Sequence, residues 1–157
     1  MENREIGYKA VLVLPYPISA NRYWRPVNIG KHITIVPTKE AKAYKAQAAL
    51  LARTAGFRKP IAGRVQVGVQ LYPHRPLDWQ KRAARDPLTW DDTVQCLDID
   101  NARKVLYDAL KGVAFEDDSR IFKDWAERME PDANGARVVV TIAPLVLKNH
   151  PQMELAA

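Results

Sequence analysis

Apolar and polar residues follow two different periods along the chain, and each period predicts one type of secondary structure. Strict alternation over short stretches predicts β-strands, and it is most regular at Val65, Val67, Val69 and Leu71. The strands predicted in this way cover residues 8–14, 64–72, 120–127 and 137–142, with a short strand or hairpin arm at 31–36. Residues 131–135 are rich in turn formers, so we expect them to join the last two strands as a hairpin.

Two longer stretches repeat apolar residues at helical spacing. The first predicted helix begins after an N-cap at Thr38 and ends at Gly56. The second begins after an N-cap at Asp100 and ends near Gly112. The stripes that these helices are expected to bury consist of Ala41, Tyr44, Ala48, Leu51 and Ala52 in the first, and of Ala102, Val105, Leu106, Ala109, Leu110 and Val113 in the second.

These elements predict a single compact domain of the α/β (α+β) class over residues 1–157. A length of 157 residues suits one domain, and 47% apolar and 27% charged residues are ordinary for a globular protein. We expect a small mixed β-sheet of about four strands with two main helices packed on it. The core covers about residues 8–143, and residues 147–157 form a tail.

Cysteine content and hydropathy indicate the compartment. Cys96 is the one cysteine, which excludes an internal disulfide and suits a reducing environment. No apolar stretch approaches the length of a membrane span, and the first residues lack the pattern of a signal peptide. We therefore expect a cytoplasmic protein that does not associate with membranes.

The net charge of +6 is unevenly distributed. Residues 1–90 contain 16 Lys and Arg and 5 Asp and Glu, a net +11, whereas residues 91–157 contain 8 and 13, a net −5. A basic half beside an acidic cluster suits a polyanion held against a metal site. A basic surface that only keeps the protein soluble is the alternative.

Acidic residues concentrate around the start of the second predicted helix. If the segment leading to it is extended, Asp98 and Asp100 point to the same side. Lys104 follows Asp100 by one helical turn on the same face, and a short loop then returns with Asp117 and Asp118. Three carboxylates and a lysine could therefore converge on one point.

Carboxylates without nearby His or Cys are hard oxygen ligands, which suit Mg²⁺ or Mn²⁺ with a phosphate completing the shell. Such an ion activates water and neutralises charge on a phosphodiester, and Lys104 could stabilise the same charge. Asp108 lies one turn beyond Lys104, so we expect it to orient that lysine by an ion pair. The alternative is a polar helix start with solvated acids.

Two other segments carry candidate contacts to nucleic acid. Asn21 to Arg25 interleaves two arginines with two aromatic residues, which could bind phosphates and stack on unpaired bases; the alternative is a loop whose aromatic side chains cap the core. Residues 74–95 hold a basic run, in which 78–85 could form one or two helical turns. We interpret 74–95 as a basic insertion beside the acidic site, with a disordered insertion as the alternative.

Taken in order along the chain, these features resemble the RusA family of Holliday junction resolvases, found in bacteria and their prophages. The residues that carry the resemblance are Leu14-Pro15, Asn21-Arg22-Tyr23, Ala43-Tyr44-Lys45, Asp98-Ile99-Asp100-Asn101 with Lys104, Asp108-Ala109-Leu110, and Asp117-Asp118. The resemblance covers about residues 8–143, and the insertion at 74–95 is longer than the family's usual basic stretch.

The resemblance implies a homodimeric, Mg²⁺-dependent endonuclease that binds four-way DNA junctions and nicks two opposing strands, with Mn²⁺ as a possible substitute. It implies catalytic roles for Asp98, Asp100, Asp118 and Lys104, the three aspartates binding the metal and Asp117 and Asp108 being further candidates at the metal site. The residues expected to contact DNA are Asn21, Arg22, Tyr23, Trp24, Arg25, Lys31, Lys45, Lys81, Arg82, Arg85 and Arg103. A non-catalytic module that binds branched DNA and a metal-dependent nuclease for other branched substrates are the alternatives.

Overall fold

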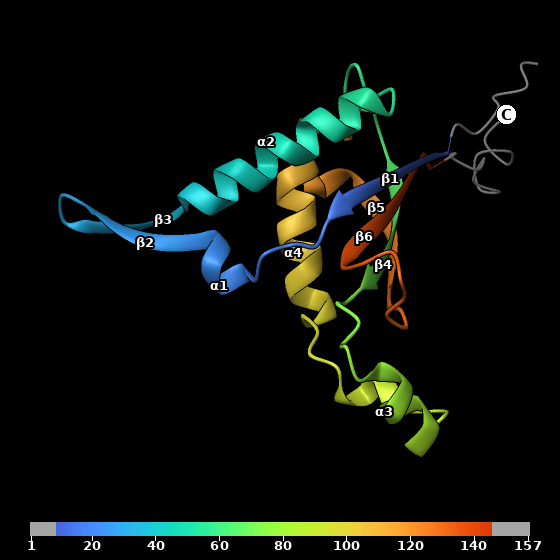
Figure 1. Cartoon of the computed structure of the whole chain (residues 1–157). Coiled ribbons are helices and arrows are strands. Elements are labelled where there is room, and N and C mark those ends of the chain that lie inside the picture. The colour runs from blue at the N-terminus through green and yellow to red at the C-terminus, as the bar shows by residue number, and fades with distance from the viewer. Residues whose placement is uncertain (1–8, 146–157) are drawn as a thin grey trace, which may run out of the picture.

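The computed structural model of the chain describes residues 9–145 (Figure 1). The predicted tail at 147–157 lies outside them. The strands are β1 (Ala10–Pro15), β2 (Trp24–Ile29), β3 (His32–Pro37), β4 (Val65–Tyr72), β5 (Ile121–Arg128) and β6 (Arg137–Pro144). The helices are α1 (Ala20–Tyr23), α2 (Lys39–Thr54), α3 (Trp79–Arg85) and α4 (Ile99–Leu110), with short 3₁₀ helices at Trp90–Thr93 (η1) and Asp118–Arg120 (η2).

Four strands form one mixed sheet in the order β1-β6-β4-β5. β6 pairs antiparallel with β1 on one side and with β4 on the other, and β4 pairs parallel with β5. The expected small mixed sheet with two main helices is confirmed. The expected hairpin of the last two strands is wrong, because the chain crosses β4 between β5 and β6.

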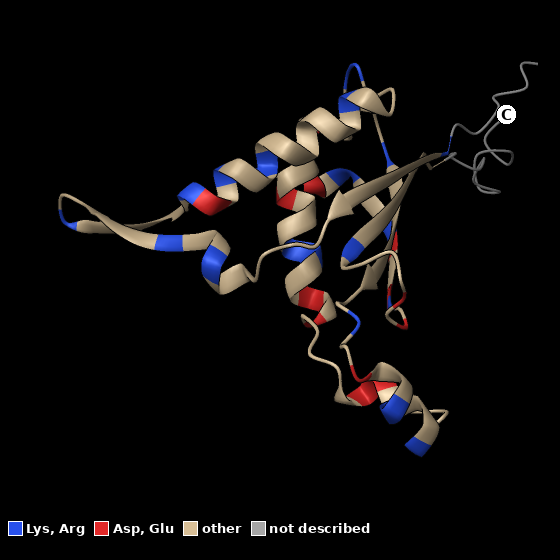
Figure 2. Ribbon diagram, viewed as in Figure 1, with Lys and Arg blue, Asp and Glu red and all other residues tan. Residues whose placement is uncertain are grey.

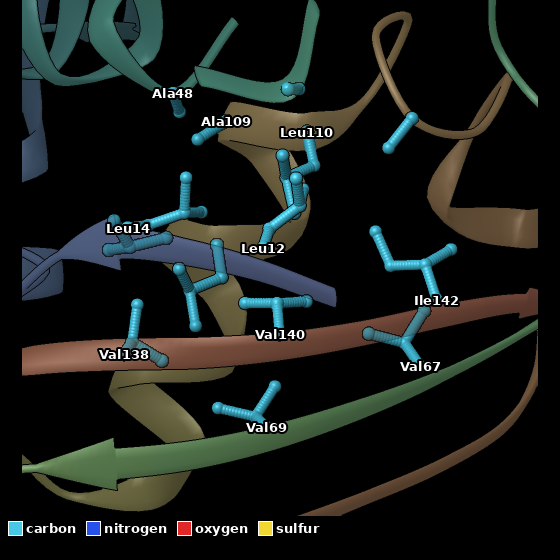
Figure 3. Close-up of a cluster of buried hydrophobic side chains, with 14 of the residues drawn as sticks. Leu12, Leu14, Ala48, Val67, Val69, Ala109, Leu110, Val138, Val140 and Ile142 are labelled. Atoms are coloured by element: carbon cyan, nitrogen blue, oxygen red, sulfur yellow. The ribbon is translucent and has the colours of Figure 1, made fainter. Parts of the chain in front are cut away.

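The core lies between one face of this sheet and the two long helices. Alternation buries Val65, Val67, Val69 and Leu71 of β4, all at most 1% exposed, as the sequence pattern predicts. Figure 3 shows this cluster, in which side chains of β1, β4 and β6 meet Ala48 of α2 together with residues of α4. Since α2 and α4 both pack on this face (Figure 1), they hold the candidate acidic residues of α4 in a fixed position relative to the sheet.

Local signals explain where the helices begin. The Thr38 hydroxyl accepts a hydrogen bond from the Ala41 N–H at 3.2 Å, which confirms the predicted N-cap of α2. The predicted N-cap of α4 is wrong by two residues. Asp98 has the extended backbone of an N-cap and its carbonyl accepts from the Ala102 N–H at 3.0 Å, so Asp100 lies inside the first turn.

Residues 74–95 form a structured appendage rather than a disordered insertion. α3 packs on η1, where the rings of Trp79 and Trp90 lie 6.2 Å apart. The Trp90 indole N–H donates to Glu130 at 2.7 Å, which ties the appendage to the segment after β5. Figure 1 shows α3 projecting from the body beyond the start of α4.

Among residues 9–145, no helix has the length and apolar character that a membrane span needs.

Candidate active site

α4 and η2 bring part of the predicted acidic set together around one cavity of about 400 Å³. Asp100 and Lys104 come from the first half of α4, Asp108 from its second half, and Asp118 from η2. The full lining consists of Trp24, Asp100, Arg103, Lys104, Tyr107, Asp108 and Asp118. The cavity lining thus contains both cationic and acidic side chains. This combination suits a phosphate that is bound together with a cation.

The helical spacing pairs Lys104 with Asp100. The Lys104 Nζ lies 3.7 Å from Asp100 Oδ2, and both side chains are more than 60% exposed. A surface pair of this kind contributes about 0–1 kcal/mol to stability, so neither side chain is held there for folding. The lysine is therefore free to exchange its partner for a substrate phosphate.

Asp108 does not orient Lys104, in contrast to the sequence-based expectation. Its Oδ2 accepts from the Tyr23 hydroxyl at 2.5 Å and lies 3.9 Å from Lys45 Nζ. Burial, and secondarily this bond to a carboxylate, raises the pKa of Tyr23, so the hydroxyl remains a proton donor. The interaction joins α1, α2 and α4 at one side of the cavity.

Asp117 and Asp118 face different surroundings. Asp117 accepts from the Ser119 N–H at 2.9 Å and pairs with Lys111 at 3.2 Å. These bonds, the Ser119 N–H first, hold the pKa of Asp117 well below its usual range. Asp117 thus caps η2, whereas Asp118 lines the cavity with Asp100.

The acidic residues are spread along α4 rather than gathered at one point, and Figure 2 shows red segments near both of its ends. Asp100 and Asp108 are eight residues apart, which corresponds to about 12 Å of helix rise. Asp98 lies before the helix and does not line the cavity. Within residues 9–145, no group of three or more His, Cys, Asp and Glu side chains is close enough to hold a metal.

The donor chemistry nevertheless fits a hard divalent cation. Asp100 and Asp118 line the same cavity, and its lining includes neither His nor Cys. Mg²⁺ commonly binds through one or two protein carboxylates and completes its shell with water and substrate phosphate. The cavity lining therefore contains two carboxylates of the type that such an ion uses.

A second cavity of about 490 Å³ adjoins the first, because Tyr107 and Asp118 line both. On this side the Tyr107 hydroxyl donates to Asp124 of β5 at 2.8 Å, and Arg103 Nε lies 3.4 Å from the same carboxylate. Arg103 Nε is buried and forms no hydrogen bond with another described residue. Sequence reasoning missed Tyr107 and Asp124, since neither residue stands out from its helix or strand pattern.

The predicted DNA-contacting residues differ in how far their side chains are exposed to solvent. Tyr23 is fully buried, so its expected stacking on bases is wrong, and the alternative of an aromatic residue in the core is correct for this residue. Trp24 is partly buried at the cavity, with its ring centroid 4.4 Å from that of Tyr23. The remaining predicted side chains are exposed or partly exposed at Asn21, Arg22, Arg25, Lys31, Lys45, Lys81, Arg82, Arg85 and Arg103.

Sequence comparison identifies the family to which these features belong. The profile of the family described as Endodeoxyribonuclease RusA matches residues 15–143, which include every residue that lines the two cavities. No curated protein matches the chain. Because the family profile extends over most of the sequence, the chain belongs to the RusA family of endodeoxyribonucleases, metal-dependent hydrolytic nucleases that resolve Holliday junctions.

Proposed function

We propose that this Holliday-junction endonuclease cleaves DNA at the cavity between α4 and η2. In this proposal Asp100 and Asp118, which line the cavity, hold Mg²⁺, for which Mn²⁺ could substitute, and Asp98 reaches the same ion from its position just before α4. Lys104 stabilises the charge that develops on the phosphate. The observation that carries it is the common cavity of Asp100, Lys104 and Asp118, which come from two separate elements. Asp98 is the N-cap of the same helix, and its side chain makes no capping hydrogen bond that would compete for the carboxylate.

The chemistry assigned to each residue follows from its charge. When bound, a divalent ion supplies water activation and charge neutralisation at the phosphodiester. Asp100 and Asp118 present carboxylate oxygens to that ion, while Lys104 can leave Asp100 and donate to a non-bridging phosphate oxygen. In-line hydrolysis then leaves a 3′-hydroxyl, and no covalent protein intermediate is needed.

We also propose that the protein acts as a homodimer. A four-way junction has approximate two-fold symmetry, so a C2 dimer can present one active site to each of two opposing strands. Two chains of net charge +6 give a dimer of about +12, which favours a polyanionic substrate. The expected products are paired nicks in opposing strands.

A synthetic mobile four-way junction tests this proposal. Products are mapped at nucleotide resolution with and without Mg²⁺, for the wild type and for Asp100→Asn and Asp118→Asn. We expect both variants to lose cleavage while junction binding survives or tightens, because each removes a negative charge that faces DNA. Asp117→Asn is the matched control and should retain most activity, since Asp117 bonds to Ser119 and Lys111.

Two results would contradict the assignment. Near wild-type cleavage by Asp100→Asn and Asp118→Asn would show that the metal does not bind in this cavity. An inactive Asp117→Asn would show that Asp117, and not Asp118, is the metal ligand. Flap, fork and RNA substrates of matched length are cleaved in parallel. Faster cleavage of any of these than of the junction would favour a nuclease for other branched substrates.

A further inference from the structure

β2 and β3 form an arm that pairs with no other strand of the described chain. Six residue pairs join them antiparallel, from Trp24 with Pro37 at the base to Ile29 with His32 near the tip, and Gly30 turns the chain with a φ of 61°. Figure 1 shows this arm extending away from the sheet and the long helices. An isolated two-stranded ribbon is only marginally stable in water, so it gains stability from whatever covers it.

The arm exposes large apolar side chains on both of its faces. Ile29, Ile33 and Ile35 are 60%, 73% and 61% exposed. Residues directly opposite each other in an antiparallel pair share a face. The register therefore groups Ile33 and Ile35 with Pro26 and Trp24, and Ile29 with the opposite face.

One of these faces is continuous with the candidate active site. Trp24 stands at the base of the face that contains Ile33 and Ile35, and it also lines the cavity of Asp100 and Lys104. The base of the arm is fixed, because the Thr38 N–H donates to the Tyr23 carbonyl at 2.8 Å. A substrate that occupies the cavity is thus adjacent to the start of this apolar face.

The charges on the arm indicate the chemistry of its partner. Residues 24–37 contain Arg25 and Lys31 and no Asp or Glu. Neither cation forms an ion pair with another residue in the range 9–145. A polyanion with an accessible apolar surface matches this combination of apolar side chains and cations without a carboxylate among them.

We propose that the face formed by Trp24, Pro26, Ile33 and Ile35 packs against base-pair faces opened at the centre of the junction. Lys31 near the turn and Arg25 on the opposite face of the ribbon contact phosphates of the adjoining DNA arms. A continuous duplex stacks these base faces on one another, whereas a branch point leaves them accessible. Apolar side chains from proteins wedge between base steps in the same way. The inference deepens the proposed function, since it rests on a four-way junction occupying the adjacent cavity.

The test replaces the apolar face without changing charge. Ile33→Thr, Ile35→Thr and the double variant keep β-branched residues at exposed strand positions, so the arm should still form. Ile29→Thr on the opposite face is the matched control. Binding to a four-way junction and to a duplex of equal length is measured in EDTA, which prevents metal-dependent cleavage, and 2-aminopurine at the branch point reports unstacking.

We expect binding of the wild type and of Ile29→Thr to increase the fluorescence of 2-aminopurine. We expect the double variant to lose most of that increase. We also expect the double variant to lower the junction-to-duplex affinity ratio about tenfold. An unchanged ratio and unchanged fluorescence would overturn the proposal. A shift of the monomer–dimer equilibrium in sedimentation without a change in the ratio would also overturn it, because the arm would then cover a second copy. Mg²⁺-dependent cleavage by the wild type is measured separately, so failure of the arm and failure of the catalytic site give different results.

Discussion

Lys104 is the residue whose loss should separate catalysis from folding. Its side chain is 63% exposed and contacts Asp100 at 3.7 Å, so Lys104→Ala opens no core cavity. We expect single-turnover cleavage to fall by about 100-fold or more, as for other groups that stabilise transition-state charge, with an unchanged melting temperature. Lys111→Ala is the control, since Lys111 pairs with Asp117 outside the cavity. Normal turnover by a folded Lys104→Ala variant would show that Lys104 does not contribute to catalysis.

Tyr23 is predicted to act through Asp108 and not through DNA. Tyr23→Phe keeps the buried ring and removes the hydroxyl that donates to Asp108 Oδ2 at 2.5 Å. A hydrogen bond to a charged group contributes about 1.5–3 kcal/mol, reduced here because Asp108 is partly exposed to solvent. We expect chemical denaturation to show a loss of about 1 kcal/mol. Tyr23→Phe and Asp108→Asn should be non-additive, because they remove the same bond.

The junction-to-duplex affinity ratio provides the second measurement on Tyr23→Phe. It should remain at the wild-type value, since the hydroxyl is bonded to Asp108 within the protein. A lower ratio would show that the Tyr23 hydroxyl contributes to recognition of the junction.

Residue-level predictions from the sequence succeeded where spacing on a single helix decided the outcome. The proximity of Lys104 to Asp100 follows directly from helical geometry. The partners of Asp108 and the burial of Tyr23 depend on how α1 packs on α4, and no local pattern encodes that packing. For the same reason, Tyr107 and Asp124 at the second cavity could not be predicted.

At the scale of elements, periodicity identified β1, β4, β6 and the two long helices because one face of each is buried. β2 was missed because Pro26 and Asn28 interrupt its pattern and the arm has no core to face. The predicted pairing of β5 with β6 was wrong for another reason. Turn residues at 131–135 permit a hairpin, but strand order is decided by long-range packing, here by β5 pairing with the far side of β4.

The parallel pair of β4 and β5 contains a close approach that a mutation can test. Gly68 lies opposite Trp125, and a Cβ at Gly68 would overlap the indole ring of Trp125. Gly68→Ala must therefore displace the indole. Because Trp125 is 44% exposed and can move toward solvent, we expect a loss of about 1 kcal/mol, at the low end of the range for overpacked cores. We expect a lower melting temperature and altered tryptophan fluorescence. The double variant with Trp125→Ala should be no less stable than Trp125→Ala alone, and additive losses would contradict the close packing of these two residues.

For the whole molecule, the count of basic residues overstates the charge available to DNA. Arg22 pairs with Glu40 at 2.7 Å, and Arg82 and Arg85 pair with Asp78 and Asp86 at 2.9 Å each. The appendage at 74–95 contains four Lys and Arg and four Asp, so it is neutral overall and the expected basic insertion is internally compensated. Figure 2 shows the same mixture of blue and red on this appendage.

Salt dependence of junction binding distinguishes free from compensated cations. Removing one cation that binds a phosphate lowers the slope of log K against log salt by about 1. Arg25→Ala and Lys31→Ala remove cations without an ion-pair partner in the described chain, so each should reduce the slope by about that amount per subunit. Arg82→Ala and Arg85→Ala should reduce it less, because binding through these arginines first breaks their pairs with Asp78 and Asp86. Fluorescence anisotropy in EDTA between about 50 and 200 mM salt measures all four slopes. Equal reductions for the two pairs of variants would show that the appendage binds DNA as directly as the arm does.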